Sequence, residues 1–145
     1  IGWVCGPAPL VSAVRTAKQF LTYVNGGPFQ PAIALGLGLS DAFFAGLAAD
    51  LQAKRDRLMP GLEAAGFTVF PTSSTYFVTA DIRPLQPDGD GMAFCRALPH
   101  RVGVVAIPTE VLYMNKHEGR HLVRFAFCKR FDVLDEAVER LRRLG

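Results

Sequence analysis

A single cation, Arg124, stands inside a short apolar run near the end of the chain. The length of that run and its aromatic and β-branched residues predict a strand over residues 122–128. Because neighbouring side chains of a strand point to opposite faces, Arg124 should face away from Phe125 and Phe127. A guanidinium on a rigid strand can hold a carboxylate through two parallel hydrogen bonds. Two structural alternatives stay open, since Arg124 could instead pair with an internal Asp or Glu or lie on an exposed sheet edge.

The rest of the chain must supply neighbours for that strand. Composition predicts an α/β fold in which three further strands join it, and a short separate strand at the start of the chain. Helices are expected where apolar residues recur at helical spacing. The predicted strands are residues 1–6, 67–70, 76–82, 102–107 and 122–128, and the predicted helices are residues 9–21, 29–39, 41–65, 92–98 and 132–144.

Three details of these helices are predictions in their own right. The segment 29–39 is apolar nearly all round, which predicts a buried helix. Pro60 lies inside the long helix 41–65 and predicts a kink or a break there. In the last helix Asp132 is expected to cap the N-terminus, with ion pairs four residues apart. Those expected pairs are Glu136 with Arg140 and Glu139 with Arg143.

Composition narrows the function classes. The net charge is only +3, and the sixteen basic residues are mixed with thirteen acidic ones, so a nucleic-acid partner is not indicated. The three cysteines are widely spaced, which favours neither a disulfide framework nor a metal site and fits a reducing cytosol. No apolar run reaches the roughly 18 residues that a membrane span needs. We therefore expect a cytoplasmic protein that has no membrane partner.

Several segments resemble one enzyme family in the same order. Residues 121–129, followed by residues 132–141, resemble the C-terminal signature of class I aminotransferases that use pyridoxal phosphate (PLP). Residues 75–81 and 103–108 resemble two strand segments that precede this signature in the family, and residues 1–7 resemble the segment just after the cofactor lysine. The resemblance implies the PLP-dependent transferase fold, here the end of a large parallel-sheet domain followed by a small α+β domain.

The resemblance also implies roles for individual residues. Arg124 matches the arginine that binds the α-carboxylate of the amino-acid substrate. Tyr23 and Asn25 lie in a loop that reaches toward the partner subunit's active site in relatives, which implies a homodimer. Trp3 could stack on a ring or a substrate, although a buried Trp that closes the first strand is the simpler interpretation. The implied substrates are an amino acid and a 2-oxo acid.

The family comparison places most of the cofactor site outside the chain. In relatives the cofactor lysine and the phosphate-binding loop precede the segment that residues 1–7 resemble, so we expect the C-terminal part of a larger enzyme. The four lysines of the chain lie on polar helix faces, in a polar loop or directly after a strand, and none is a credible cofactor lysine. They are Lys18, Lys54, Lys116 and Lys129. The chain alone is therefore expected to be inactive, with PLP bound mainly by the remaining part.

A narrower resemblance concerns the substrate. Residues 23–31 and 94–99 resemble the actinobacterial N-succinyldiaminopimelate aminotransferases, which implies N-succinyl-LL-2,6-diaminopimelate and 2-oxoglutarate as substrates in lysine biosynthesis. The chain departs from the family pattern at Ser74 and Thr109, where relatives have glycine. A polar loop could select an acidic distal group of the substrate or could simply be solvated. Its ionic residues are Lys116, His117 and Arg120.

The domain organisation follows from these assignments. Residues 1–40 are interpreted as a piece of the large PLP-binding domain, residues 41–66 as a linking helix and residues 67–145 as the small C-terminal domain. Two other interpretations stay open. The chain could be a non-catalytic α/β module that binds a small carboxylate or serves in dimerisation, or it could belong to a family member with lyase chemistry.

Overall fold

The computed structural model describes residues 1–24 and 26–145. These residues form two compact units, Ile1–Ala45 and Gly46–Gly145. The two units are described separately below. The division falls inside a long helix, a few residues after the boundary at residue 40 that the sequence predicts. That the first unit belongs to a larger cofactor domain stays a prediction.

The first unit contains α1 (Ala8–Leu21), α2 (Phe29–Leu37) and the start of α3 (Asp41–Ala64). Pro9 lies in the first turn of α1, where its missing N–H costs little, as the sequence predicts. The predicted strand at residues 1–6 is wrong, because residues 1–7 form no regular structure. A strand needs a neighbour for its backbone hydrogen bonds, and the described residues of this unit contain no other strand.

Helix α2 forms where the sequence predicts it, but its predicted burial is wrong. No residue of α2 is buried, and Leu35 is 78% exposed. A helix that is apolar on every side needs a surrounding layer of other elements, and the described part of this unit does not supply one. Among the described residues no single helix is long and apolar enough to cross a membrane, and α2 and α3 pass that test only when taken together.

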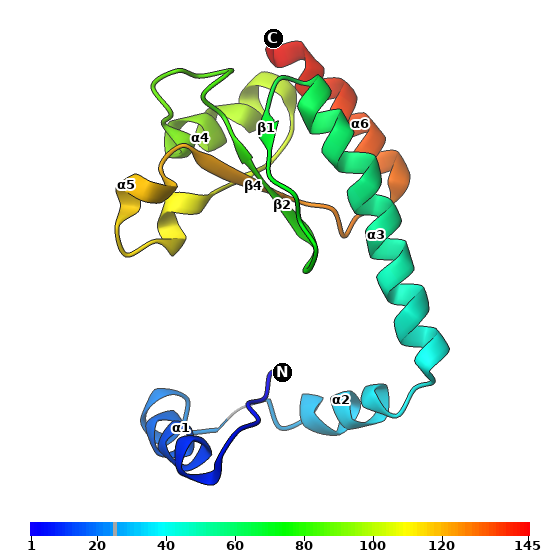
Figure 1. Cartoon of the computed structure of the whole chain (residues 1–145), viewed down its shortest axis with the longest axis vertical. Coiled ribbons are helices and arrows are strands. Elements are labelled where there is room, and N and C mark those ends of the chain that lie inside the picture. Colours follow the sequence, from blue (N-terminus) through cyan, green and yellow to red (C-terminus); the bar gives the residue numbers. More distant parts are fainter. Residues whose placement is uncertain (25) are drawn as a thin grey trace. The chain divides into compact units, whose positions relative to one another are not determined.

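The second unit is built on an antiparallel sheet with the strand order β1-β2-β4-β3 (Figure 1). The two inner strands, β2 and β4, pair along five residues, with Thr79 opposite Arg124. The elements of this unit besides α3 are β1 (Thr68–Val69), β2 (Phe77–Asp81), α4 (Gly91–Val102), β3 (Ile107–Pro108), η1 (Thr109–Leu112), α5 (Lys116–Gly119), β4 (Leu122–Ala126), α6 (Phe131–Leu141) and η2 (Arg142–Leu144).

A continuous hydrophobic core joins one face of the sheet to helices α3, α4 and α6. Helices α3 and α6 run side by side (Figure 1), and Phe67 lies at the centre with edge-on contacts to Phe94 and Phe125 at 5.9 and 5.4 Å between ring centroids. The burial of apolar side chains from elements far apart in sequence stabilises this unit. The most buried of them are Leu62, Val78, Ala80, Ile82, Leu98, Val123, Phe127 and Leu141.

The predicted strand over residues 102–107 is wrong in most of its length. Helix α4 does not end before Pro99 but continues through it to Val102. Gly103 then adopts a φ of 70°, a left-handed conformation that favours glycine and ends the helix. Residues 104–106 form no strand, and only Ile107 and Pro108 pair with β4. The apolar run at 102–107 is thus divided between a helix end, an extended connection and a two-residue strand.

Helix α3 is also longer than its proline predicts. It is not broken at Pro60 and runs from Asp41 to Ala64, and Gly66 follows with a φ of 96°, as expected for the residue that stops the helix. A charged side chain of this helix also makes a specific contact with α6. Arg57 donates two hydrogen bonds to the Asp135 carboxylate on α6, at 2.6 and 3.0 Å. These bonds hold the pKa of Asp135 below its usual range.

Helix α6 confirms the predicted apolar face, because Leu134, Val138 and Leu141 are buried. Asp132 is not the N-cap, since the helix starts at Phe131 and the Asp132 carboxylate pairs with Arg130. The ion pair of Glu136 with Arg140 is confirmed. Glu139 pairs with Arg142 instead of the predicted Arg143, because residues three apart are also neighbours on a helix surface.

Candidate functional site

Arg124 lies on an inner strand of the sheet. Its strand, β4, has β2 on one side and β3 on the other, so Arg124 is flanked by Thr79 and Ile107. The predicted alternation is confirmed, because Val123 and Phe125 are buried on the core side while Arg124 is half-buried on the opposite face. The alternative in which Arg124 occupies a sheet edge is therefore wrong.

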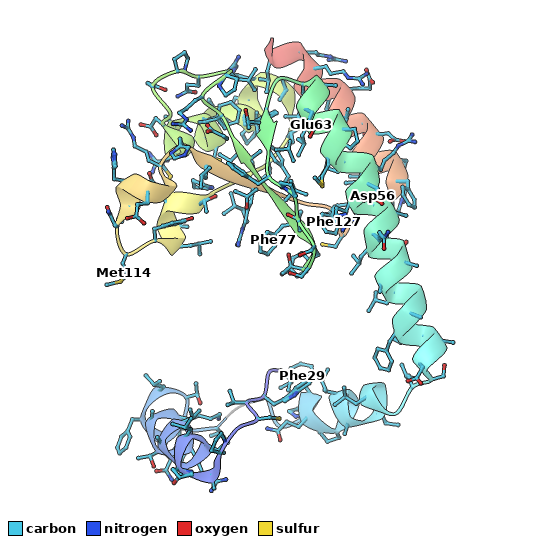
Figure 2. All side chains as sticks on the ribbon, viewed as in Figure 1. Phe29, Asp56, Glu63, Phe77, Met114 and Phe127 are labelled. Carbon is cyan, nitrogen blue, oxygen red and sulfur yellow. The ribbon has the colours of Figure 1, made fainter. Side chains whose placement is uncertain are left out.

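The guanidinium of Arg124 is stacked on an aromatic ring. Its Cζ atom lies 4.4 Å from the centroid of the Phe77 ring on β2, a separation at which a cation and a ring attract each other. Tyr76 packs edge-on against the same ring at 5.7 Å between centroids. Figure 2 shows Phe77 near one end of β2, on the side of the sheet away from α3.

No carboxylate in the described part of the chain forms an ion pair with Arg124. The second structural alternative, an internal Asp or Glu partner, is thus not realised among these residues. A guanidinium has five N–H donors arranged in a planar fork. The central carbon of the guanidinium lies over the Phe77 ring, and its donors are available to a carboxylate from outside the chain.

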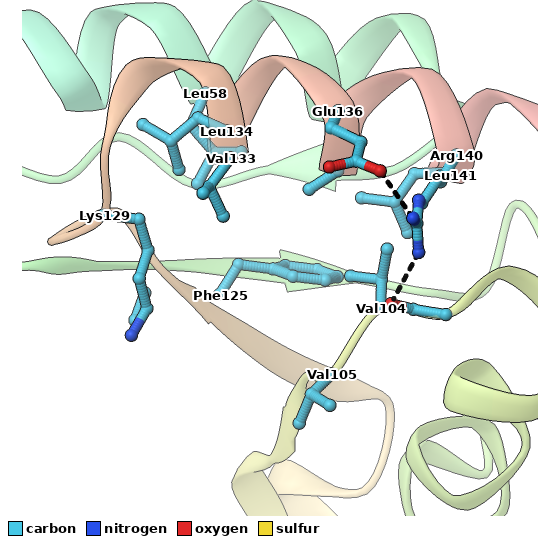
Figure 3. Close-up of a pocket in the computed structure, with 13 residues that line it drawn as sticks. Leu58, Val104, Val105, Phe125, Lys129, Val133, Leu134, Glu136, Arg140 and Leu141 are labelled. Carbon is cyan, nitrogen blue, oxygen red and sulfur yellow. Dashed lines mark hydrogen bonds and ion pairs between the residues drawn. The ribbon is translucent and has the colours of Figure 1, made fainter.

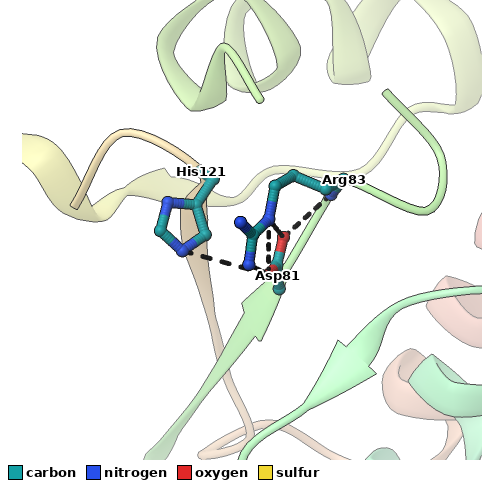
Figure 4. A network of polar contacts seen from close by, with 3 residues as sticks. All are labelled: Asp81, Arg83 and His121. Atoms are coloured by element: carbon teal, nitrogen blue, oxygen red, sulfur yellow. Dashed lines mark hydrogen bonds and ion pairs between the residues drawn. The ribbon is translucent and has the colours of Figure 1, made fainter. Parts of the chain in front are cut away.

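A buried carboxylate, Asp81, lies at the end of β2. It accepts hydrogen bonds from the backbone N–H of Arg83 at 2.9 Å and from the Arg83 guanidinium at 2.5–3.1 Å, and His121 Nε2 is 3.9 Å away (Figure 4). Burial raises the pKa of Asp81, but the Arg83 hydrogen bonds outweigh it and hold the pKa below its usual range. Because its partners are internal, we interpret Asp81 as a structural anchor for the chain after β2.

The Asp81 anchor predicts a pH-dependent stability. Its pKa is lowered in the folded state, so its contribution is complete above the ordinary aspartate pKa of about 3.9 and is lost as the pH falls below that value. We expect Asp81→Asn to lower the urea midpoint of the full-length protein at pH 7 and to differ less from the parent at pH 3. Equal differences at the two pH values would show that the Asp81 charge does not stabilise the fold. Asp88→Asn, in the adjacent loop, is the matched control.

Thr109 occupies one of the two positions where the sequence departs from the family pattern. It begins η1 directly after β3, is 7% exposed, and its Oγ1 atom has no hydrogen-bond partner among the described residues. A buried hydroxyl without a partner costs about 1–3 kcal/mol. We therefore expect Thr109→Val, which keeps the shape, to raise the free energy of unfolding by about 1 kcal/mol, measured by urea unfolding. Thr109→Ser keeps the hydroxyl and should give no gain, and a gain in both variants would contradict this explanation.

The pocket in Figure 3 lies between α6 on one side and β4 with residues 103–105 on the other, and has a volume of about 270 Å³. Its walls are largely apolar, and the polar contacts in it join lining residues to one another. Arg140 pairs with Glu136 and donates to the Gly103 carbonyl at 3.4 Å. Arg124 does not line this pocket. Because Arg124 lies elsewhere and Glu136 and Arg140 are paired with each other, we do not interpret this pocket as the site.

The reactive side chains of the described residues do not form a cofactor site. Lys18 donates to Thr22 at 3.1 Å, Lys54 pairs with Asp50 at 2.6 Å, and Lys116 and Lys129 are exposed. Burial raises the pKa of the Cys95 thiol to about 12, which makes it a poor nucleophile. No group of three His, Cys, Asp or Glu in the described part of the chain is arranged to hold a metal. These residues do not fit the role of holding PLP.

Two of the other predicted site residues belong to the first unit. Trp3 and Tyr23 belong to the first unit and are 65% and 87% exposed, whereas Arg124 belongs to the second unit. The simpler interpretation of Trp3 as a buried residue that closes a strand is wrong. Asn25 lies outside the described residues. The roles of Trp3, Tyr23 and Asn25 in the site stay predictions.

The polar loop around residue 116 is partly ordered by local contacts. Lys116 and His117 belong to the short helix α5, and Arg120 lies 3.4 Å from Asp90. All three side chains belong to exposed residues. Selection of an acidic substrate group by this loop stays a prediction.

Phe77 is the site residue that the sequence did not indicate. Its strand and its aromatic ring are visible in the sequence, but its contact with Arg124 depends on the pairing of β2 with β4. Phe77 is directly opposite Ala126, which makes Arg124 its diagonal neighbour. Aromatic and long side chains reach each other across such a diagonal.

Arg124 is thus a half-buried arginine on an inner strand of an α/β scaffold, and its guanidinium donors, unpaired among the described residues, have the chemistry to bind a carboxylate. The chain belongs to the family of class I and II aminotransferases, whose family model matches residues 1–141. Members of this family are PLP-dependent. The order of motifs in the sequence predicted this family, and the match confirms it.

Among its relatives, the chain is 52% identical to the Mycobacterium tuberculosis protein named Probable N-succinyldiaminopimelate aminotransferase DapC, over 100% of this chain and 38% of the relative. The solved structure of N-succinyldiaminopimelate aminotransferase from M. tuberculosis superposes with a TM-score of 0.85 at 54% identity and the same coverage. The methionine aminotransferase YbdL of Escherichia coli superposes with a TM-score of 0.76 at 31% identity, over 94% of this chain and 35% of that one. The chain thus spans little more than a third of the length of these proteins.

Proposed function

We propose that the complete protein is a PLP-dependent aminotransferase that moves an amino group between an amino acid and a 2-oxo acid. Arg124 carries this proposal, because its guanidinium lies on an inner strand with no internal carboxylate partner among the described residues. Membership of the class I and II family supports the reaction class. The assignment of this chain as the C-terminal part of the enzyme comes from the order of its motifs and belongs to the proposal.

In this proposal Arg124 binds the α-carboxylate of either substrate. Two parallel hydrogen bonds from the guanidinium fork fix both carboxylate oxygens and hence the orientation of the α-carbon. PLP, when bound by the rest of the protein, supplies the electron sink for the chemistry at that carbon. The contribution of this chain is therefore geometric, since a fixed carboxylate decides which α-bond is presented for reaction.

We further propose that the amino donor is N-succinyl-LL-2,6-diaminopimelate and the acceptor is 2-oxoglutarate, in lysine biosynthesis. The similarity to the M. tuberculosis proteins over the whole chain supports this substrate pair. The proposal includes a cytoplasmic homodimer in which Trp3, Tyr23 and Asn25 line the pocket. It also keeps residues 1–40 as a piece of the large domain, 41–66 as the linking helix and 67–145 as the small domain.

The test uses the natural protein, purified from its own host and reduced with borohydride before its intact mass is measured. We expect a chain well above 15.8 kDa that carries a pyridoxyl adduct. A 15.8 kDa chain without an adduct would instead support the carboxylate-binding module. Glutamate formation from 2-oxoglutarate should be faster with N-succinyl-LL-2,6-diaminopimelate than with methionine or kynurenine, and the reverse order would contradict the proposed donor.

A further inference from the structure

We propose that Phe77 is a positioning residue that holds the Arg124 guanidinium ready for a substrate carboxylate. This inference rests on the proposed function of Arg124 and adds a second residue to the same site. The contact between Arg124 Cζ and the Phe77 ring, at 4.4 Å to the centroid, is the observation that carries it.

The register of the sheet explains the contact between Phe77 and Arg124. Thr79 and Ile107 lie directly opposite Arg124 on the two neighbouring strands and bracket its position on the sheet. Phe77 is opposite Ala126, whose single methyl group leaves room above the strand. The Phe77 ring can therefore lie over the diagonal toward Arg124.

The Phe77 ring is itself supported. The Tyr76 ring packs against it at 5.7 Å between centroids with an angle of 90° between the planes, so its edge meets the neighbouring π-system. Tyr76 is exposed, whereas Phe77 is half-buried. This edge-on contact restricts the movement of the Phe77 ring beside Arg124.

The contact with the Phe77 ring leaves the Arg124 guanidinium able to bind a carboxylate. The Phe77 ring contacts Arg124 through its π-face and forms no hydrogen bond, so it does not consume the N–H donors of the guanidinium. An arginine side chain otherwise samples many rotamers, and ordering it on binding costs free energy. A preformed stack provides this ordering before the substrate arrives, so Phe77 should improve carboxylate binding without touching the carboxylate.

The test compares Phe77→Leu and Phe77→Tyr in the full-length holoenzyme, with L-glutamate and 2-oxoglutarate as the probes. Loss of the stack is expected to raise both KM values about fivefold, while kcat stays within about twofold because the reacting atoms are not touched. Phe77→Tyr retains the π-face and should restore KM to within about twofold of the parent. A KM for Phe77→Leu equal to that of the parent would overturn the inference.

A double-mutant cycle distinguishes positioning from a general structural effect. In an Arg124→Ala background, Phe77→Leu is expected to change KM no further, because its target is gone. Additive effects would show that Phe77 acts independently of Arg124 and would also overturn the inference. If Phe77→Leu does not fold, as judged by circular dichroism, Phe77→Met replaces it in the same cycle. An unchanged KM in Arg124→Ala would reject the proposed role of Arg124 in binding the carboxylate, and absence of transamination in the parent holoenzyme would reject the proposed function, so these failures are distinct from a failure of the inference about Phe77.

Discussion

Replacing Arg124 by alanine in the full-length protein is expected to lower kcat/KM for L-glutamate and 2-oxoglutarate about a hundredfold. A hydrogen bond to a charged group contributes about 1.5–3 kcal/mol, and a bidentate pair loses two of them. At the lower end of that range the loss is about 3 kcal/mol, and about 1.4 kcal/mol corresponds to a tenfold change, which gives about a hundredfold. Most of the loss should appear in KM, because the carboxylate is held in the bound substrate as well as in the transition state. Steady-state kinetics with each substrate varied in turn measures it.

Two further variants show whether the loss comes from the fork geometry. Arg124→Lys keeps the charge but not the planar pair of donors, so its KM should lie between those of the parent and Arg124→Ala. Arg130→Ala is the matched control, because Arg130 is an exposed arginine that already pairs with Asp132. Its kinetics should match the parent. Cofactor content, measured by absorbance, should be the same in all variants, and unchanged KM and kcat in Arg124→Ala would remove Arg124 from the site.

Gly61→Ala is expected to lower the free energy of unfolding by about 2 kcal/mol, although alanine favours helices. A Cβ at Gly61, on α3, would lie only 2.4 Å from a Val138 methyl group on α6. Forcing a methyl group into a packed core costs about 1–3 kcal/mol or somewhat more, against a gain of about 1 kcal/mol in helix propensity. Urea unfolding of the full-length protein measures the net effect.

The control for this prediction lies in the same helix. A Cβ at Gly46 would meet nothing within 4 Å, so Gly46→Ala should stabilise the protein by up to about 1 kcal/mol. Adding Val138→Ala to Gly61→Ala removes the clashing methyl groups and should recover much of the loss, which gives a favourable coupling between the two substitutions. Strictly additive losses would mean that α3 and α6 do not pack through Gly61 and Val138.

Local sequence patterns predicted the structure correctly where the direction of a side chain depends on a single strand or helix. The alternation along residues 122–128 predicted that Arg124 and Phe125 point to opposite faces of the sheet, and β4 confirms this. The spacing of Leu134, Val138 and Leu141 predicted the buried face of α6. These predictions depend only on the period of a strand or a helix. The order of family-like segments identified the class I and II aminotransferases without any structure.

Predictions failed where two local sequence signals favour different structures, or where packing against another element determines the structure. At residues 102–107 the apolar composition favoured a strand, but Gly103 could end a helix in a left-handed conformation, and α4 extends to it. Pro60 did not break α3, because the packing of Leu58 and Leu62 in the core holds that part of the helix on the sheet. The apolar composition of α2 indicated burial, yet burial requires a facing surface that composition cannot specify.

The sequence by itself determined the family, the strand that carries Arg124 and the face to which Arg124 points. Only the tertiary structure decided that this strand lies inside the sheet, that no internal carboxylate among the described residues pairs with Arg124, and that Phe77 lies against its guanidinium. The physical reason is the range of the interactions. Periodicity is a property of one segment, whereas strand order and register depend on pairing between segments more than forty residues apart.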